Sequence, residues 1–397
     1  MKSTKTLKIF SKALGLICLS FLIYSCLSTK DSAVLPEAPA TTFNSCNYTP
    51  APKGSRKLGM DILSETTAKN YASNLATLQS LHGEYQTLHL TWSQLESAGS
   101  GTTSGSFSDP SNALDAFNTI ANNNGIKLAL SIRPIDATGK TVPSDLANTR
   151  FNNAALQTRF KNLINFVLTK ISKNNLVVLI IGNEIDGYNI GSDSTFWSDY
   201  ANFLYEMKIH IANNHVGLKM GTTVTHAALT ESTKVLSGGA SSQTIFSSYF
   251  PHIASGTAVV DVVGVTYYPL TNSLTMKDPS VVAEDFNHLV AFTDLPIYIQ
   301  EIGYASSTAS NGSDYKQAQF FCEVMKAWDD HASAIPRMAI LRINDITRSE
   351  AETMAGPYGT STESFIEYLR SLGIFTNAGS QKNSYTIISE ELIKRNF

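Results

Sequence analysis

From residue 56 onward, the chain alternates between two hydrophobic patterns. Short, almost continuous apolar runs are separated by longer stretches in which apolar residues recur every three or four positions. The first pattern is typical of strands buried on both faces, and the second of amphipathic helices. The runs predict eight strands, at residues 57–63, 85–92, 126–134, 176–184, 217–225, 259–268, 296–303 and 337–344. The intervening stretches predict helices such as 67–81, 155–171, 195–214 and 313–331.

Alternating strands and helices favour an α/β fold with a parallel sheet. Eight such units fit a closed (β/α)8 TIM barrel better than an open doubly wound sheet. The Gly-rich phosphate-binding fingerprint of dinucleotide folds is also missing after the first run. We therefore expect residues 56–397 to form a single catalytic barrel domain.

The first 25 residues have the layout of a secretory signal. Several lysines are followed by an apolar stretch, residues 13–24, and then by the small Ser25. The stretch is short for a membrane span of roughly 20 residues. Its end resembles a bacterial lipoprotein cleavage box, which implies that Cys26 becomes the lipidated first residue of the mature protein. The alternative is an ordinary signal peptide cut nearby.

Residues 26–55 are rich in Ser, Thr, Ala and Pro and have no hydrophobic periodicity, as expected of a flexible tether. Together with the signal, this segment predicts a protein of the bacterial cell envelope. It would be lipid-anchored at the outer membrane or cell surface, or else secreted. Contact with a membrane would then be through the lipid anchor only.

Composition excludes some partners and cofactors. The 397 residues carry a formal net charge of −3 with no sustained basic run, so we expect no nucleic acid partner. We also expect the protein to be a monomer. The eight histidines show no metal-ligand spacing, so neither a metal nor a cofactor is expected. Cys46 and Cys322 are the cysteines left for the exported domain, and their pairing stays open.

Two apolar runs end on carboxylates. Glu184 closes the run 176–184, and Glu301 lies near the end of 296–303. The active site of a (β/α)8 barrel is built at the C-terminal ends of the strands, so both side chains should face its mouth. Two carboxyl groups roughly 5 Å apart are the equipment of retaining glycoside hydrolysis, which needs no cofactor. For either glutamate alone, a role as a helix-capping partner is the alternative.

Around these carboxylates the sequence resembles a known family. "GNEI" at 182–185, "GVTYYP" at 264–269 and "QEIGY" at 300–304 resemble signatures of clan A glycoside hydrolases, nearest in appearance to arabinogalactan endo-β-1,4-galactanases. The resemblance implies a retaining glycoside hydrolase that cleaves β-linked polysaccharide by double displacement. Glu184 would be the acid/base, Glu301 the nucleophile, and Asn183 would hydrogen-bond the sugar 2-hydroxyl.

Further side chains near strand ends are candidates for substrate binding. Strand alternation puts Tyr268 and Tyr267 on opposite faces and makes Tyr268 the better candidate to hydrogen-bond the predicted nucleophile, although it could also be a packing residue. Trp92 could stack on a sugar ring or simply pack at the rim. Arg133 and Arg342 could hold a nucleophile ionised or form exposed salt bridges. For the following residues we expect a place in the pocket without assigning a role: His89, His226, Asp61 and Asp136.

The substrate is less well defined. The family's tryptophan on strand eight is replaced here by Leu341 and Arg342. Because only Arg133 and Arg342 supply positive charge near the predicted site, we expect a neutral β-linked glycan, galactan-like first, then mannan, xylan or glucan. Endo action is expected in an open groove, unless the loop 96–111 blocks it and leaves an exo-acting pocket. The aromatic residues expected to line the groove are Trp92, Tyr188, Tyr267, Tyr268 and Tyr304.

Two other classes of protein remain as alternatives. A non-catalytic glycan-binding barrel lipoprotein should have lost one carboxylate, but both are present. A metal-dependent esterase or deacetylase should have clustered His and Asp ligands at strand ends, which the sequence does not show.

Overall fold

The computed structural model describes Phe43 and residues 45–63, 70–188, 190, 193–231, 234–237, 239–252 and 258–397. The predicted signal peptide and the predicted lipidation site, Cys26, lie outside the described residues.

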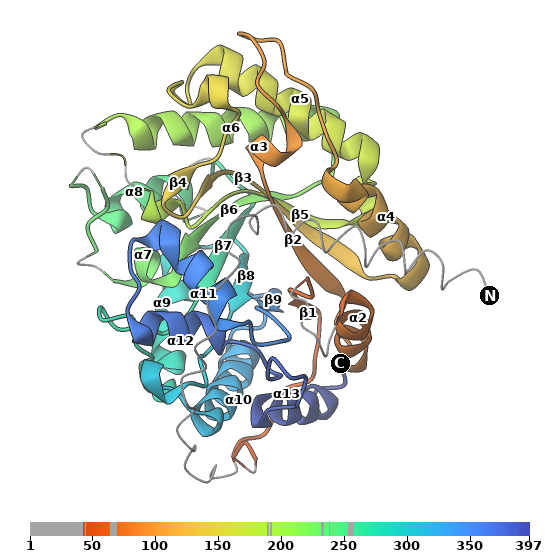
Figure 1. The fold of residues 1–397 in the computed structure, drawn as a ribbon, viewed down its shortest axis with the longest axis vertical. Coiled ribbons are helices and arrows are strands. Elements are labelled where there is room, and N and C mark those ends of the chain that lie inside the picture. The colour runs from red at the N-terminus through yellow and green to blue at the C-terminus, as the bar shows by residue number, and fades with distance from the viewer. Residues whose placement is uncertain are drawn as a thin grey trace.

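The sheet is a closed barrel (Figure 1). Its eight parallel strands are joined in the order β2-β1-β9-β8-β7-β6-β5-β3, and pairing between β2 and β3 closes the ring. The short β4 pairs antiparallel with the end of β3. The strands are β1 Lys57–Met60, β2 Tyr85–Thr91, β3 Lys127–Asp136, β4 Gly139–Lys140, β5 Leu176–Asn183, β6 Met220–Thr225, β7 Val262–Tyr267, β8 Ile297–Ile302 and β9 Arg337–Ile340. All eight predicted strands and the predicted (β/α)8 TIM barrel are therefore confirmed.

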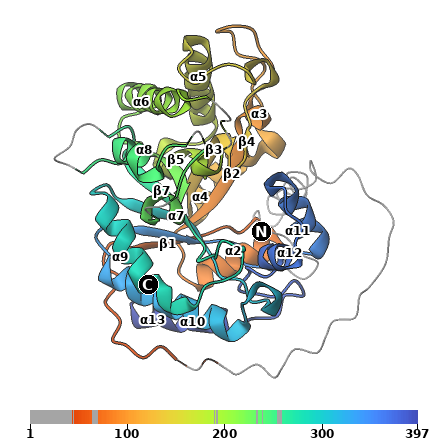
Figure 2. The same ribbon diagram turned by 90° about the vertical axis from the view of Figure 1, so that its left-hand side faces the viewer.

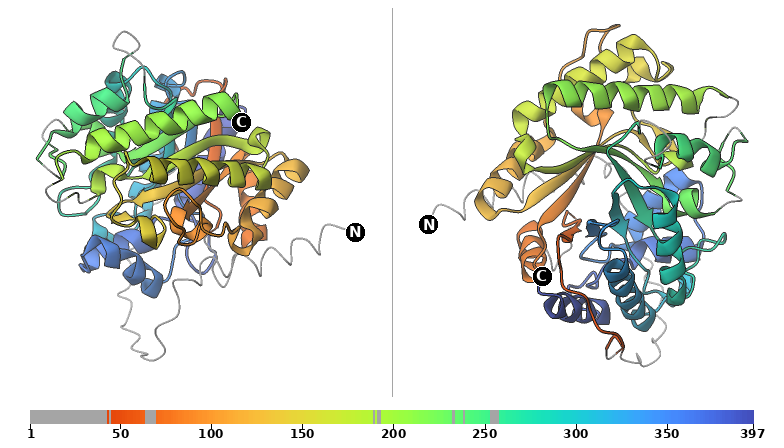
Figure 3. Two further views of the ribbon diagram at one scale, coloured as in Figure 1. Left: turned by 90° about the horizontal axis from the view of Figure 1, so that it is seen from above. Right: turned by 180° about the vertical axis from the view of Figure 1, so that it is seen from behind.

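Helices surround the barrel and complete its βα units (Figure 3). The four helices predicted from periodicity are found as α2, α5, α6 and α10, with ends within a few residues of those expected. The helices are α2 Tyr71–Ser80, α3 Trp92–Leu95, α4 Ala113–Asn124, α5 Ala154–Lys170, α6 Phe196–Asn214, α7 His226–Thr230, α8 Ser242–Tyr249, α9 Val282–Phe292, α10 Asp314–Asp330, α11 Arg348–Ala355, α12 Glu363–Arg370 and α13 Asn383–Lys394.

Strand β5 shows why the apolar runs become barrel strands. Successive side chains of a strand point to opposite faces. Leu179 and Ile181 pack in the large core between sheet and helices, whereas Val178 and Ile180 belong to a smaller cluster of inward-facing residues. Both faces are thus buried, and each aliphatic side chain contributes about 1.5–3 kcal/mol. A continuous apolar run is the only pattern that satisfies both faces.

Helix boundaries follow local chemistry. The side chain of Asn153 accepts hydrogen bonds from the amides of Ala155 and Leu156 and so caps the start of α5. Helix α4 ends at Gly125, whose φ of 71° lies in the left-handed region that glycine adopts most easily.

The N-terminal segment corrects one predicted boundary. Residues 26–55 are expected to be a flexible tether, but the described part from Phe43 onward packs on the barrel. Cys46 forms a disulfide with Cys322 of α10, and the amide of Lys53 donates to the carbonyl of Arg395. The two ends of the described chain therefore lie side by side below the barrel (Figure 3). The sequence pattern does not predict this packing, because the contacts, which include the disulfide and an apolar cluster of Phe43 and Tyr48 against Ile387, join residues far apart in the chain.

The loops that follow the C-terminal ends of the strands lie together on one side of the barrel. Helix α3 follows β2, β4 follows β3 and α11 follows β9, and Figure 2 shows all three on the same side. This side is the mouth of the barrel, where both predicted catalytic glutamates are found. Within the described residues, no helix is both long and apolar enough to span a bilayer.

Candidate active site

Glu184 is aimed by a sharp bend at the end of β5. Gly182 has a φ of 87°, and a Cβ at this position would lie 2.3 Å from the hydroxyl of Tyr200, so only glycine fits. Glu184 itself adopts a left-handed conformation with a φ of 43°. Non-glycine residues in this region are strained by about 1–3 kcal/mol and cluster at functional sites.

A β-bulge aims Glu301. Val265 of β7 pairs with Ile299 of β8, but the next residue, Thr266, pairs with Glu301, so β8 carries one extra residue here. A bulge of this kind re-aims the following side chain. Ile297 and Ile299 face the outer core, and without the bulge alternation would send Glu301 the same way. The extra residue turns Glu301 to the inside of the barrel.

Strand β7 supplies one hydrogen-bond donor to each glutamate. The hydroxyl of Thr266 donates to Glu184 over 2.8 Å, and the hydroxyl of Tyr268 donates to Glu301 over 2.8 Å. Tyr267, between them, points outward and donates to Asp285 of α9. Alternation along β7 therefore puts Thr266 and Tyr268 on one face, as the sequence predicts for Tyr268.

Arg133, near the end of β3, links the site together. One guanidinium nitrogen donates to Glu301 over 3.4 Å, and another donates to Asp136 over 2.9 Å. The side-chain amide of Asn183 donates to the same carboxylate of Asp136 over 3.1 Å. Of the arginines predicted to hold Glu301 ionised, Arg133 is the one in contact with it.

The two glutamates are electrostatically different. Burial, followed by the nearby charge of Glu301, raises the pKa of Glu184 to about 8. Burial also raises the pKa of Glu301, but Arg133 and the hydrogen bond from Tyr268 oppose that shift. Glu301 is therefore the first of the pair to lose its proton, and Glu184 keeps its proton at neutral pH.

His89 of β2 brings an uncharged polar group to the same place. Burial, with the charge of Arg133, lowers its pKa well below the ordinary value for histidine. Its Nε2 lies 4.0 Å from an oxygen of Glu301, and neither ring nitrogen finds a hydrogen-bond partner among the described residues. His89 can thus offer a donor and an acceptor to a ligand held beside Glu301.

Trp92 corrects a predicted binding role. It is 0% exposed, its ring packs on Phe160 of α5, and its indole N–H donates to the buried Glu96 over 2.7 Å. Glu96 is in turn paired with Arg159. Stacking of Trp92 on a sugar is therefore wrong, because the ring is enclosed on all sides. The other predicted groove residues that are fully buried are Tyr267 and Tyr304.

Arg342 also differs from the prediction. It has a left-handed backbone with a φ of 56°, and its guanidinium donates to the carbonyl of Leu369 over 3.0 Å and contacts the sulfur of Met354. Both partners belong to the segment that follows β9. Arg342 therefore fastens that segment and is not described in contact with either glutamate, so its predicted role at the nucleophile is wrong.

His226 lies outside the expected pocket. It begins α7, its ring packs on that of Tyr267, and its Nε2 lies 3.7 Å from Asp285 of α9. It therefore faces the helical layer and not the barrel mouth.

Three residues of this region were not predicted from the sequence. Thr266 could have been found, because alternation places it on the face of Tyr268. Tyr358 and Tyr368 lie beyond the last strand, where no periodicity relates them to the mouth. The negative charges of Glu184 and Glu301, after burial, raise the pKa of both tyrosines, which indicates that they lie near these carboxylates. In the part of the chain that the structure describes, no group of three or more His, Cys, Asp or Glu residues is arranged to hold a metal ion.

Known proteins resemble the chain in fold and not in sequence. No family model and no curated protein matches it. A GH5_18 protein from Streptomyces cattleya, solved in complex with Manβ1-4GlcNAc, has a TM-score of 0.61 at 14% identity, covering 85% of this chain and 80% of that chain. The exo-β-1,4-mannosidase Op5Man5 from Opitutaceae bacterium strain TAV5 has a TM-score of 0.56 at 13% identity, covering 88% of this chain.

The chain spans 62% of the length of that mannosidase. A family 39 glycoside hydrolase from Bacteroides cellulosilyticus WH2 has a TM-score of 0.55 at 13% identity, covering 86% of this chain and 64% of that chain. These neighbours are clan A glycoside hydrolases, and at such identities the likeness establishes the TIM-barrel fold alone. None of these three is named as a galactanase.

Proposed function

We propose that the protein is a retaining O-glycosyl hydrolase that cleaves β-linked neutral glycans with Glu184 as acid/base and Glu301 as nucleophile. The observation that carries this proposal is the asymmetry of the two carboxyl groups. Glu184 has a pKa of about 8 and is protonated at neutral pH, whereas Glu301 is held by Arg133 and Tyr268. Pairs of carboxyl groups whose environments separate their pKa values divide into an acid and a base or nucleophile.

In the first step, a carboxylate oxygen of Glu301 attacks the anomeric carbon. The glycosidic C–O bond breaks, and the proton of Glu184 passes to the leaving oxygen. Glu301 loses its negative charge when it forms the new ester bond. Before the attack, Arg133 and Tyr268 hold its carboxylate in position and leave it ionised.

In the second step, Glu184, now ionised, removes a proton from a water molecule, which attacks the anomeric carbon and releases Glu301. Two inversions at the same carbon retain its configuration. Loss of the negative charge on Glu301 during the intermediate lowers the pKa of Glu184, because that charge is one cause of its elevation. The same residue can therefore act first as an acid and then as a base.

The charges around the site favour an uncharged substrate. Arg133 is already shared between Asp136 and Glu301, and Arg342 is directed to Leu369. Neither guanidinium is free to form the bidentate pair that a uronate carboxylate prefers. The unpaired nitrogens of His89 are suited instead to sugar hydroxyl groups.

The proposed function is tested with 4-nitrophenyl β-glycosides of galactose, mannose, glucose and xylose, with the product configuration followed by NMR. We expect hydrolysis of at least one neutral β-glycoside with the β-anomer formed first. Initial formation of the α-anomer would contradict the double displacement. Binding of oligosaccharides without any cleavage would favour the non-catalytic alternative.

The pH dependence of kcat should follow the ionisation of the two glutamates. We expect kcat to fall above about pH 8, where Glu184 loses its proton. Arg133→Gln removes a cation that lowers the pKa of Glu301, so that pKa rises and the acidic limb of the profile moves to higher pH. The matched control is Arg150→Gln, since Arg150 is half exposed and pairs with Asp199, away from the site. An unchanged acidic limb in Arg133→Gln would show that Glu301 does not set it.

We also propose that the mature protein is anchored in the bacterial cell envelope through a lipid on Cys26. The support is the signal-like sequence that precedes this residue. Cys26→Ser is expected to move the protein from the membrane fraction to the soluble fraction. A variant that stays in the membrane fraction would refute the anchor.

A further inference from the structure

The segment after β9 covers part of the barrel mouth. Here the sequence lacks the tryptophan of the resembled family and continues through α11, a turn at Gly356–Tyr358 and α12. We call residues 345–375 the insert. Figure 2 shows α11 and α12 together on the mouth side of the barrel.

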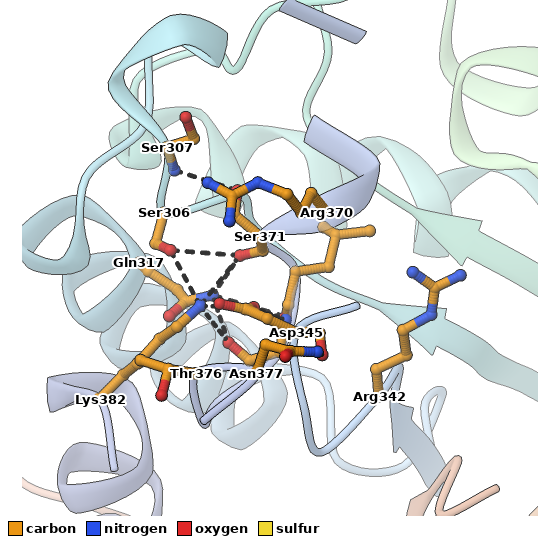
Figure 4. A network of polar contacts seen from close by, with 12 residues as sticks. Ser306, Ser307, Gln317, Arg342, Asp345, Arg370, Ser371, Thr376, Asn377 and Lys382 are labelled. Atoms are coloured by element: carbon orange, nitrogen blue, oxygen red, sulfur yellow. Dashed lines mark hydrogen bonds and ion pairs between the residues drawn. The ribbon is translucent and has the colours of Figure 1, made fainter. Parts of the chain in front are cut away.

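A buried polar network fixes the base of the insert (Figure 4). The ammonium group of Lys382 donates to Asp345 over 2.7 Å, to Ser306 over 2.9 Å and to the carbonyl of Gly373 over 2.8 Å. Ser306 lies in the loop after β8, so the network ties the insert to its neighbouring loop. The insert is therefore held in one position relative to the barrel.

The turn of the insert, Gly356–Tyr358, reaches the loop that follows β3. The hydroxyl of Thr138, in the turn between β3 and β4, donates to the carbonyl of Pro357 over 3.0 Å. In the barrel order, β1 and β2 lie between β9 and β3. A contact between the loops after β9 and β3 must therefore pass over the ends of β1 and β2, and we call it the bridge.

The bridge carries an exposed aromatic ring. Tyr358 follows Pro357 and is 46% exposed. Its ring contacts Phe365, Phe365 stacks on Tyr368, and Tyr368 packs edge-on against Tyr268. Since Tyr268 donates to Glu301, a continuous series of rings leads from Tyr358 to the proposed nucleophile.

The barrel order shows how the bridge lies relative to the two glutamates. Glu184 follows β5, and the leaving group must lie on its side because Glu184 protonates the leaving oxygen. In the ring of eight strands, β9 lies four positions from β5, directly opposite. β3, which carries the other end of the bridge, adjoins β5, so the bridge runs across the mouth from the side opposite Glu184 to the side next to it.

We propose that the bridge closes one end of the substrate groove and that Tyr358 packs against the terminal sugar, so that the enzyme removes sugars from chain ends. This inference rests on the proposed function and replaces the endo action expected from the sequence. The loop 96–111, the alternative block of the groove, packs instead on α5. Its Phe107 stacks on Phe166 of α5, and Glu96 pairs with Arg159 of the same helix.

Tyr358 should be a specificity-determining residue. An aromatic face in contact with the apolar face of a sugar contributes about 1.4 kcal/mol, which corresponds to about a tenfold change in binding. Tyr358→Ala is expected to raise KM about tenfold with a smaller change in kcat, while Tyr358→Phe keeps the wild-type KM. The matched control is Tyr205→Ala, since Tyr205 is 40% exposed on the outer helix α6.

The test uses β-1,4-linked hexasaccharides of galactose, mannose and glucose, reduced at one end so that fragments can be assigned, with the aryl glycosides run in parallel. We expect the wild type to give a monosaccharide and a pentasaccharide as first products. Thr138→Val, which removes the hydrogen bond to Pro357, should add internal fragments. The inference would be overturned by internal fragments from the wild type, or by equal KM values for Tyr358→Ala and Tyr205→Ala. In either case, cleavage of the aryl glycosides would still support the proposed function. Cleavage of neither substrate class would overturn both.

Discussion

Glu301→Ala is expected to lower kcat on the order of 10⁵-fold, the scale of loss found when a catalytic nucleophile is removed. In the proposed mechanism, the carboxylate of Glu301 attacks the anomeric carbon. Arg133 and Tyr268 hold this carboxylate at the end of β8. Glu184→Ala should cost about 10²–10⁴-fold with natural leaving groups, because general acid catalysis is lost but the nucleophile remains. Circular dichroism should show both variants folded.

Azide separates the two roles. In Glu301→Ala, azide takes the place of the nucleophile, attacks once and gives a glycosyl azide of inverted configuration. In Glu184→Ala with an aryl glycoside, azide replaces the activated water and gives a product of retained configuration. If the two configurations were exchanged, the roles assigned to Glu184 and Glu301 would also have to be exchanged.

Lys382→Met is expected to lower the free energy of unfolding by about 3–5 kcal/mol, because it leaves the buried carboxylate of Asp345 without its cation. The carbonyls of Ser371 and Gly373 would lose the same donor. Urea denaturation followed by fluorescence measures the loss.

The matched control is Arg348→Ala in α11 of the same insert. Arg348 pairs with Glu363 at an exposed site, where such pairs contribute at most about 1 kcal/mol. Equal losses in the two variants would show that the network of Figure 4 does not stabilise the insert as described.

The barrel could be predicted because its signal is local. A strand such as β5, buried against helices on one face and against the barrel interior on the other, requires a continuous apolar run, and the sequence displays it directly. The ends of those runs are then the barrel mouth, which is how Glu184 and Glu301 are found without any structure.

Contacts between distant segments could not be predicted in the same way. Trp92 follows a strand as a binding residue would, but its neighbour Glu96 is paired with Arg159, 63 positions further along the chain, and this pairing draws the indole inward. The bulge that turns Glu301 into the barrel depends on the register of β8 against β7. Neither the register nor the pairing leaves a periodic signal in the sequence.

The insert is the clearest example of a feature that the sequence pattern does not predict. Its role depends on single hydrogen bonds, from Thr138 to Pro357 and from Lys382 to Asp345, between residues far apart in the chain. The absence of the strand-eight tryptophan could be read from the sequence, but Tyr358, the residue proposed to contact the terminal sugar, lies in the turn of the insert, where no periodicity relates it to the mouth.

The most direct test of the proposed mechanism is to trap the covalent intermediate between the sugar and the enzyme. A 2-deoxy-2-fluoro glycoside with a good leaving group, of the sugar that the aryl-glycoside panel identifies, should inactivate the protein with one sugar attached per chain. Peptide mass spectrometry should place this sugar on Glu301. Attachment to any other residue, or turnover of the natural substrate with inverted configuration, would contradict the proposed mechanism.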